Sequence, residues 1–174
     1  MINARDDLSW TPLHLAADLG DVEMVTALLS NAVDIDVRSI SGQTALTRAV
    51  YWGSIPCIRL LLAYGTNAGN VETDGCTVLH RAVSKMAVGS SLEHGKVDNL
   101  EDMVLECTQL LLEHGASVLE NHQGATPLHA AESKKYTRVA DLLRHRLVNP
   151  DPPRLDQKRV LADAADALAS LSFI

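Results

Sequence analysis

Histidine is the residue type best suited to acid–base or metal chemistry near neutral pH, and this chain has seven. A metal site on a single helix needs two histidines one turn apart, as in H-E-x-x-H, and no pair in the sequence has that spacing. A zinc site assembled from distant segments is the remaining metal alternative. The histidines concerned are His14, His80, His94, His114, His122, His129 and His145.

The other reactive residue types also lack the arrangement that chemistry requires. The three cysteines, Cys57, Cys76 and Cys107, form no C-x-x-C pair, which argues against a disulfide framework or a cysteine-rich zinc site and fits a reducing compartment. The acidic pairs Asp6-Asp7 and Glu101-Asp102 are adjacent in sequence and are interpreted as solvated or helix-start charges. G-x-S-x-G, G-x-x-x-x-G-K-[ST] and G-x-G-x-x-G are all absent. We therefore expect no enzyme activity, no catalytic residue, no metal and no cofactor.

Charge and composition narrow the choice of partners. The 174-residue chain has a formal net charge of −7, which gives it no electrostatic attraction to nucleic acid or to an anionic membrane. Its first residues lack the apolar run of a signal peptide, and no apolar stretch approaches membrane-spanning length. Hydrophobic residues make up 47% and aromatic residues only 3%, so the core must be aliphatic. We expect a soluble cytoplasmic protein, with the nucleus as the alternative.

The sequence repeats itself, and the repeat must position whatever site exists. Segments of similar sequence open at Thr11, Thr44 and Thr77 with a constant period, and a fourth opens at Thr126 after a longer interval. Two copies read T-P-L-H. Each unit ends in a leucine pair, and a glycine stands two residues before each later threonine. The leucine pairs are Leu28-Leu29, Leu61-Leu62, Leu111-Leu112 and Leu142-Leu143, and the glycines are Gly42, Gly75 and Gly124.

These residues predict two antiparallel helices in each unit. Threonine caps a helix by accepting a backbone N–H bond, and proline after it suits the first turn. Gly20 and Gly53, which hold the same position after their threonines, allow a left-handed turn between the two helices. The glycine before each threonine suits a tight, hairpin-like turn between units.

A 33-residue period with T-P-L-H-x-A closely resembles the ankyrin repeat, over roughly residues 2–146. The resemblance implies an all-α ankyrin-repeat solenoid of antiparallel helix pairs joined by hairpin-like loops. It also implies a structural role for His14, His80 and His129, which would hydrogen-bond backbone between neighbouring units. The sequence departs from the pattern at Thr47, which replaces the motif histidine. It also has Pro56 early in a second helix, and the fourth copy is one residue short before Leu142-Leu143.

The resemblance divides the chain into an array and a tail. A stiff proline-rich linker follows the array, and the residues after it carry apolar side chains on one predicted helical face. That helix is expected either to cap the open end of the solenoid or to dock on another protein. We expect an array at 1–148, with units at about 9–41, 42–74, 75–123 and 124–148, an insertion near 86–102, a linker at 149–153 and the helix at 154–174.

The insertion lies in the third unit. Residues 89–96 read as a loop, and Asp98 with Glu101 three residues later resembles a capping box. Helical spacing then predicts a long second helix from about Asn99 to Glu113. The insertion is either a tolerated surface loop or a functional finger beside the groove.

Few aromatic residues occur, and their positions are informative. The resemblance implies binding through the hairpin tips and the inner face of each first helix. Trp10 and Gln43 would lie at hairpin tips, whereas Asp18-Leu19 and Tyr51-Trp52 would end first helices. Packing between units is the alternative role for Trp52 and Tyr64. Rings of this kind dominate binding hot spots.

We therefore expect an adaptor or scaffold that binds a protein segment in its concave groove, with Asp18, Asp74 and Lys85 fixing the register. One alternative is a small-molecule-binding protein or unusual enzyme, in which the aromatic groove and Asp18 stabilise a cation. The other is a structural segment of a longer array, because the chain begins in mid-pattern. A monomer is expected unless the N-terminal face associates. The expected partner-binding residues are Leu8, Trp10, Asp18, Leu19, Ile40, Gln43, Tyr51, Trp52, Tyr64 and Lys85.

Overall fold

The computed structural model describes residues 3–31, 33–86 and 100–149. Regular secondary structure in these residues is helical, with an isolated β-bridge between Val71 and Thr77. Most of the insertion, including Asp98, and the predicted C-terminal helix at 154–174 lie outside them, as does all of the linker except Asn149. The helices are α1 (Pro12–Leu19), α2 (Val22–Leu29), α3 (Ala45–Tyr51), α4 (Ile55–Ala63), α5 (Val78–Lys85), α6 (Leu100–Glu113), α7 (Pro127–Ser133) and α8 (Thr137–Val148).

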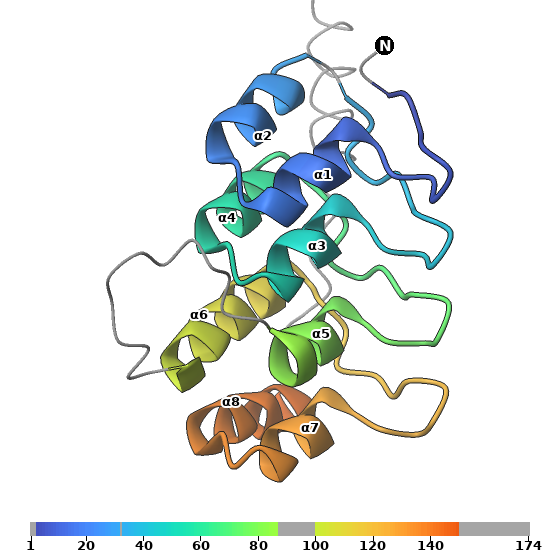
Figure 1. The fold of residues 1–174 in the computed structure, drawn as a ribbon. Helices are drawn as coiled ribbons and strands as arrows, with labels where there is room; N and C mark the ends of the chain where they lie inside the picture. The colour runs from blue at the N-terminus through green and yellow to red at the C-terminus, as the bar shows by residue number, and fades with distance from the viewer. Residues whose placement is uncertain (1–2, 32, 87–99, 150–174) are drawn as a thin grey trace, which may run out of the picture.

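The helices form two layers (Figure 1). The first helices of the units, α1, α3, α5 and α7, stack on one another, and the second helices α2, α4, α6 and α8 stack behind them. The loops between units project to one side in a row. This arrangement confirms the predicted all-α solenoid of helix pairs joined by hairpin-like loops.

The helix starts follow directly from the repeated threonines. Thr11, Thr44, Thr77 and Thr126 are the N-caps of α1, α3, α5 and α7, and each forms a capping box with the residue three positions later. The capping residue is histidine in three units and Thr47 in the second. Because a cap depends only on residues three apart, local sequence is enough to predict it.

Stacked hairpins are joined by a ladder of equivalent backbone hydrogen bonds. The Ile40 amide donates to the Leu8 carbonyl at 3.1 Å, and one repeat later the Thr73 amide donates to the Ser41 carbonyl at 3.2 Å. Gly75 lies in this stack with φ +79°, and a Cβ there would clash with the His122 ring and backbone. Glycine at this position therefore serves both the turn and the close approach of the next hairpin.

Two motif histidines bind the units together, in the role that the resemblance implied. The His14 imidazole accepts the Thr11 amide at Nδ1, and its Nε2 donates to the Gln43 carbonyl of the next hairpin at 3.0 Å. His80 repeats this contact with the Ala125 carbonyl at 2.8 Å. His129, in the last unit, is exposed.

The core between the layers is aliphatic. Leu13, Leu46 and Leu79 occupy the same position in successive units and are at most 1% exposed. Cys57 and Cys107 are fully buried in the second helices, and burial raises the pKa of each thiol. These two cysteines are therefore packing residues. Cys76 is half-buried at its hairpin, where burial also raises its pKa.

The fourth unit keeps the register of the others despite its displaced leucine pair. Leu143 is fully buried and stands in the same place relative to its capping threonine, Thr126, as Leu61 does relative to Thr44. No residue is therefore missing from the unit. The next position, which Leu62 holds in the second unit, is instead taken by the exposed Arg144.

Helix α6 begins close to the predicted start and supports the next unit. Its first turn carries Glu101, whose carboxylate accepts the backbone amide of Arg138 at 2.8 Å, and Asp102, which pairs with the Arg138 side chain. Arg138 lies in the first turn of α8, whose N-cap residue Tyr136 makes no side-chain cap bond. A carboxylate from the third unit therefore satisfies an amide at the start of this helix.

Candidate functional site

The candidate site lies where α1, α3 and the first two hairpins meet on the inner face of the array. Its centre is Arg48, which sequence reasoning did not select. The Arg48 guanidinium lies over the Trp10 ring, with 4.8 Å to the ring centroid, and over the Tyr51 ring, at 5.1 Å. Cation–π attraction of this kind is strengthened by partial burial, and the Arg48 side chain is only 15% exposed.

Asp18 holds the other side of this arginine. One carboxylate oxygen of Asp18 accepts Nε of Arg48 at 2.8 Å and also pairs with the Arg48 Nη2. The same oxygen accepts the indole N–H of Trp52 at 2.5 Å. Trp10, Asp18, Arg48, Tyr51 and Trp52 thus form one connected group, which we call the Arg48 cluster.

The Arg48 cluster corrects two expectations about Asp18. As a rim charge, Asp18 was expected to set the register of a partner, but its carboxylate is satisfied within the chain and its side chain is only 20% exposed. The groove was also expected, in the small-molecule alternative, to bind a cation. Arg48 already occupies that position.

A polar network continues the cluster toward the third unit. The Gln43 side chain accepts from Arg48 at 3.4 Å and donates to the Glu72 carboxylate at 3.0 Å. Glu72 is buried and forms a two-bond pair with Arg81 at 2.7 and 3.0 Å, and Arg81 also reaches Asp74 at 2.7 Å. The hydrogen bonds that Arg81 donates to Glu72 raise the pKa of Arg81. The inner face therefore changes from aromatic to ionic along the array.

Asp74 belongs to the ionic part. Burial acts to raise the pKa of its carboxyl, but the Cys76 amide and the Arg81 charge outweigh it, so that the pKa lies below its ordinary value. Asp74 remains half-exposed at its side chain. Of the three charges expected to fix a partner's register, Asp74 and Lys85 are exposed.

The first two hairpins and α1, which carry part of the cluster, also expose apolar residues. Leu8 is 58% exposed, and Leu19 and Ile40 are each 65% exposed. Leu15, which sequence reasoning missed, is 53% exposed and lies at the same position after its threonine as Arg48 and Arg81. The equivalence of Leu15, Arg48 and Arg81 in successive repeats was the signal by which all three positions could have been found.

Tyr64 does not join the site. It is the C-cap of α4 and half-exposed, whereas Trp52 and Ser54 stand where α3 passes into α4. The nine residues of α4 therefore separate Tyr64 from Trp52 by about 13 Å along the helix axis. Lys85 ends α5 at the position of Trp52 in the preceding repeat, and therefore lies one unit further along the face.

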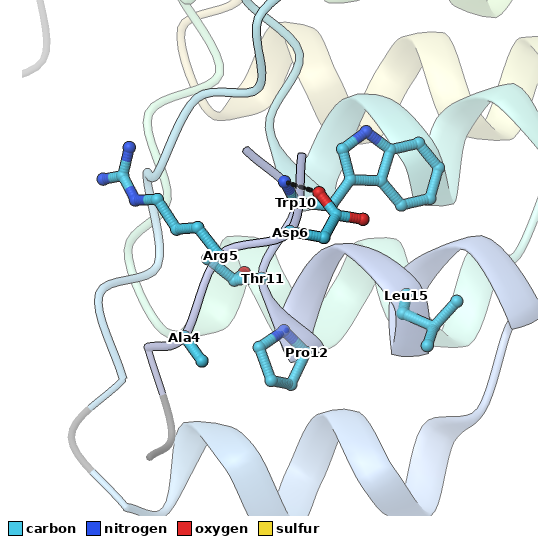
Figure 2. A pocket seen from close by; sticks show the side chains of 7 residues that line it. All are labelled: Ala4, Arg5, Asp6, Trp10, Thr11, Pro12 and Leu15. Carbon is cyan, nitrogen blue, oxygen red and sulfur yellow. Dashed lines mark hydrogen bonds between the residues drawn. The ribbon is translucent and has the colours of Figure 1, made fainter. Parts of the chain in front are cut away.

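A hollow of about 390 Å³ adjoins the cluster at the first hairpin. Figure 2 shows that it lies between this hairpin and the start of α1, with Asp6 accepting the Trp10 backbone amide at 2.8 Å. Its lining is mainly apolar. The lining residues are Ala4, Arg5, Asp6, Trp10, Thr11, Pro12 and Leu15.

Two features of the described residues bear on other classes of function. None of their helices combines the length and apolar character needed to cross a membrane. In the same residues, no three side chains of His, Cys, Asp or Glu gather in a group able to hold a metal ion.

Stacked helix pairs with one continuous inner face define a repeat solenoid, a class that binds through extended surfaces. Residues 13–94 match the family model described as ankyrin repeats (3 copies). Together with the T-P-L-H motifs and the fold, this match shows that the chain is an ankyrin-repeat protein.

Curated relatives are similar over most of this chain. The nuclear factor NF-kappa-B p105 subunit of Gallus gallus is 30% identical over 154 residues, covering 86% of this chain and 14% of that protein. The B-cell lymphoma 3 protein homolog of Mus musculus is 33% identical over 145 residues, covering 82% and 28%. Ankyrin repeat and SOCS box protein 16 of Homo sapiens is 29% identical over 125 residues, covering 71% and 24%. The chain thus spans less than a third of each relative's length.

Proposed function

We propose that the first two units bind an apolar segment of a protein partner, as an adaptor or scaffold. Ankyrin repeats are generally protein–protein interaction modules, and proteins of this kind are typically not enzymes. The observation that carries the proposal is that Leu8, Leu15, Leu19 and Ile40 are exposed on the same hairpins and helix that carry aromatic rings held in place by Arg48.

Preorganisation supports this role for the Arg48 cluster. Binding loses free energy when mobile side chains must be ordered. Here Trp52 is fixed by Asp18, and the Trp10 and Tyr51 rings are fixed by contact with Arg48. A partner therefore meets a formed surface, on which Leu19 and Ile40 supply apolar contact and Gln43 a polar edge.

The structure also modifies the proposed set of binding residues. Trp10, Asp18, Gln43, Tyr51 and Trp52 form and support the platform. Leu8, Leu19 and Ile40 present the apolar contact, joined by Leu15. We propose that Lys85 and Asp74 also contact the partner. Both are exposed charges that lie further along the same face, within the array at 1–148. Tyr64 is left as a separate exposed residue on the second-helix layer.

The test compares substitutions at two leucines of similar exposure. Leu19→Glu places a charge on the proposed surface, whereas Leu119→Glu changes a residue that is 69% exposed in the hairpin before the fourth unit. Both are expected to fold, because neither side chain is buried. Quantitative affinity capture from cell lysate would identify bound proteins, followed by a binding isotherm with each purified candidate.

The expected result is a partner whose affinity falls at least tenfold with Leu19→Glu and stays within twofold with Leu119→Glu, because a central hot-spot residue is worth about 1.4 kcal/mol or more. Equal affinities for both variants would place the binding surface outside the first two units and refute the proposal.

A further inference from the structure

One position of the repeat changes its chemistry along the inner face. Counted from the capping threonine, the position at the end of each first helix holds Leu19, Trp52, Lys85 and Lys134 in turn. The first two side chains are aliphatic and aromatic, and the last two are cationic. The helices that carry them stack directly on one another (Figure 1), so the four positions follow one another along the array.

Exposure at this position does not depend on where the array ends. Helix α5 packs between α3 and α7, so the third unit has a neighbour on both sides, and Lys85 is nevertheless exposed. Lys134 holds the same position in the fourth unit and is also exposed. A further unit stacked on the fourth would therefore leave Lys134 accessible, as the fourth unit leaves Lys85.

The two lysines also lack the internal partners that the neighbouring arginines have. Among the described residues, no carboxylate pairs with Lys85 or Lys134, and the Lys134 ammonium lies 5.8 Å from the centroid of the Tyr136 ring. Arg48 and Arg81, in contrast, are held by carboxylates of the chain itself. An unpaired ammonium gains a charge-assisted hydrogen bond when a carboxylate arrives, whereas a paired guanidinium gains little.

Small side chains accompany the lysines. Ser84 and Ser133 directly precede them, and the fourth unit has Ala130 at the position that Arg48 and Arg81 hold in the second and third units. The backbone of a bound segment can therefore approach this part of the inner face, and the ammonium groups are the charged groups that it meets at the helix ends.

We propose that Lys85 and Lys134 bind two carboxylates of the same partner segment whose apolar part contacts the first two units. This inference rests on the proposed function and adds the chemistry of the partner. Stacked helices lie about 9–10 Å apart, so the two carboxylates are separated by about that distance along the segment. The partner segment is thus apolar at one end and acidic at the other.

The charged groups on this face select Asp or Glu side chains rather than phosphate. Phosphate is bound in proteins mainly by arginine clusters, whose planar forks take two oxygens, and Arg48 and Arg81 already hold carboxylates. A long polyanion such as nucleic acid would meet the formal net charge of −7 of the whole chain. A short acidic segment meets only the local cations, because salt screens charges beyond about 8 Å.

The first experiment selects peptides on the immobilised full chain from a phage library of random sequences. Enriched peptides are expected to carry apolar residues at one end and Asp or Glu at the other. The double variant Lys85→Met with Lys134→Met is expected to keep the apolar preference and lose the acidic one. The matched control is Arg59→Met with Arg144→Met, which removes the same charge from exposed positions on the second-helix layer and should change neither preference. Circular dichroism would verify that both variants fold.

The second experiment measures coupling between the lysines and the acidic residues. An enriched peptide is compared with a counterpart in which each Asp or Glu is replaced by its amide, and fluorescence anisotropy gives the affinity of both for each variant. The amide peptide is expected to bind the unaltered chain about three- to tenfold more weakly at low salt, since exposed charge pairs are individually modest. Both peptides should bind the lysine double variant equally.

The outcomes separate this inference from the proposed function. Apolar enrichment without acidic residues, or an acidic preference that persists in the lysine double variant, overturns the role of Lys85 and Lys134 and leaves the apolar surface in place. Apolar enrichment that Leu19→Glu does not reduce refutes the proposed function instead. A selection that enriches no peptide contradicts both.

Discussion

Arg48 provides, from within the chain, the cation that an aromatic groove would otherwise take from a ligand. Its guanidinium contacts the rings of Trp10 and Tyr51 and the carboxylate of Asp18. The three groups come from the first hairpin, α1 and α3, so a single side chain joins two repeats. A ligand cation would have to displace it, which favours a binding surface over a cation pocket.

Replacing Arg48 by methionine should therefore lower the free energy of unfolding by about 1–3 kcal/mol, since it removes two cation–π contacts and leaves a partly buried carboxylate. Urea denaturation measures this. The control is Arg59→Met, whose ion pair with Glu106 is half-exposed and should be worth less than about 1 kcal/mol. Trp10 and Trp52 are the only tryptophans, so intrinsic fluorescence should shift with Arg48→Met alone. Equal losses in both variants would contradict a special role for Arg48.

The buried His14 makes stability depend on pH. Burial, the largest cause, and the Arg48 charge lower the pKa of His14, against the raising effect of its bond to the Gln43 carbonyl. The unfolded chain therefore binds this proton more readily than the folded chain. The contribution of His14 to the free energy of unfolding should be complete above pH ~6.5. It should fall as the pH drops through 6.5 toward the lower pKa of the folded state.

His14→Gln should accordingly flatten the change in stability between pH 7 and pH 5, even though the variant is less stable at pH 7. Urea midpoints at several pH values would show this. A slope in the variant as steep as that of the unaltered chain would mean that other groups cause the acid sensitivity.

At the scale of the helix pair, the units differ in how they hold the next hairpin. His14 and His80 each donate to a carbonyl of the following hairpin, but the second unit has Thr47, which bonds to Thr44 at 3.3 Å. The carbonyl in the corresponding position is that of Cys76. The link between the hairpin before α3 and the hairpin before α5 therefore depends more on the bonds from Gln43 to Glu72 and from Thr73 to Ser41.

Thr47→His should restore the missing link and stabilise the array by about 0.5–1.5 kcal/mol, the usual net value of a buried hydrogen bond. The substitution keeps the capping role, because histidine fills it at the same position in three other units. Thermal denaturation provides the measurement. Thr47→Asn, whose side chain is too short to reach the carbonyl, should bring no gain. Destabilisation by Thr47→His would show that the second unit lacks room for the ring.

At the scale of the whole molecule, the two ends of the array are unlike. One end exposes apolar side chains of α1 and α2, and the other carries Glu132 and Arg144 where internal units have valine and leucine. Terminal repeats need a polar outer face for solubility. The charged end therefore limits stacking on that side.

The double substitution Glu132→Val and Arg144→Leu should convert the charged end into an apolar face like those between internal units. Copies should then stack head to tail and grow into longer assemblies, because a heterologous contact does not close. Light scattering over a concentration series would detect the growth. Adding Met24→Arg should abolish it, since the exposed Met24 of α2 lies at the apolar end that the stack needs. A variant that stays at the mass of the unaltered chain would show that these two charges do not control assembly.

The sequence by itself determined the repeat, its period and the start of each first helix. It also identified His14 and His80 as links between units through their motif. These features depend on residues a few positions apart, where capping, turn formation and helical spacing act locally. The start of α6 was close to prediction for the same reason. The aromatic residues Trp10, Tyr51 and Trp52 lie in one cluster formed by neighbouring units, and their role in partner binding stays a prediction.

The tertiary structure alone decided which side chains meet. Asp18 and Arg48 are far apart in the sequence, and whether they touch depends on the distance and rotation between stacked helices. The same geometry turned Asp18 inward, separated Tyr64 from the cluster, and placed Arg144 rather than a leucine on the last face. Contacts between repeats come from packing across units, which no local rule specifies, and so the repeat could be predicted whereas its inner network could not.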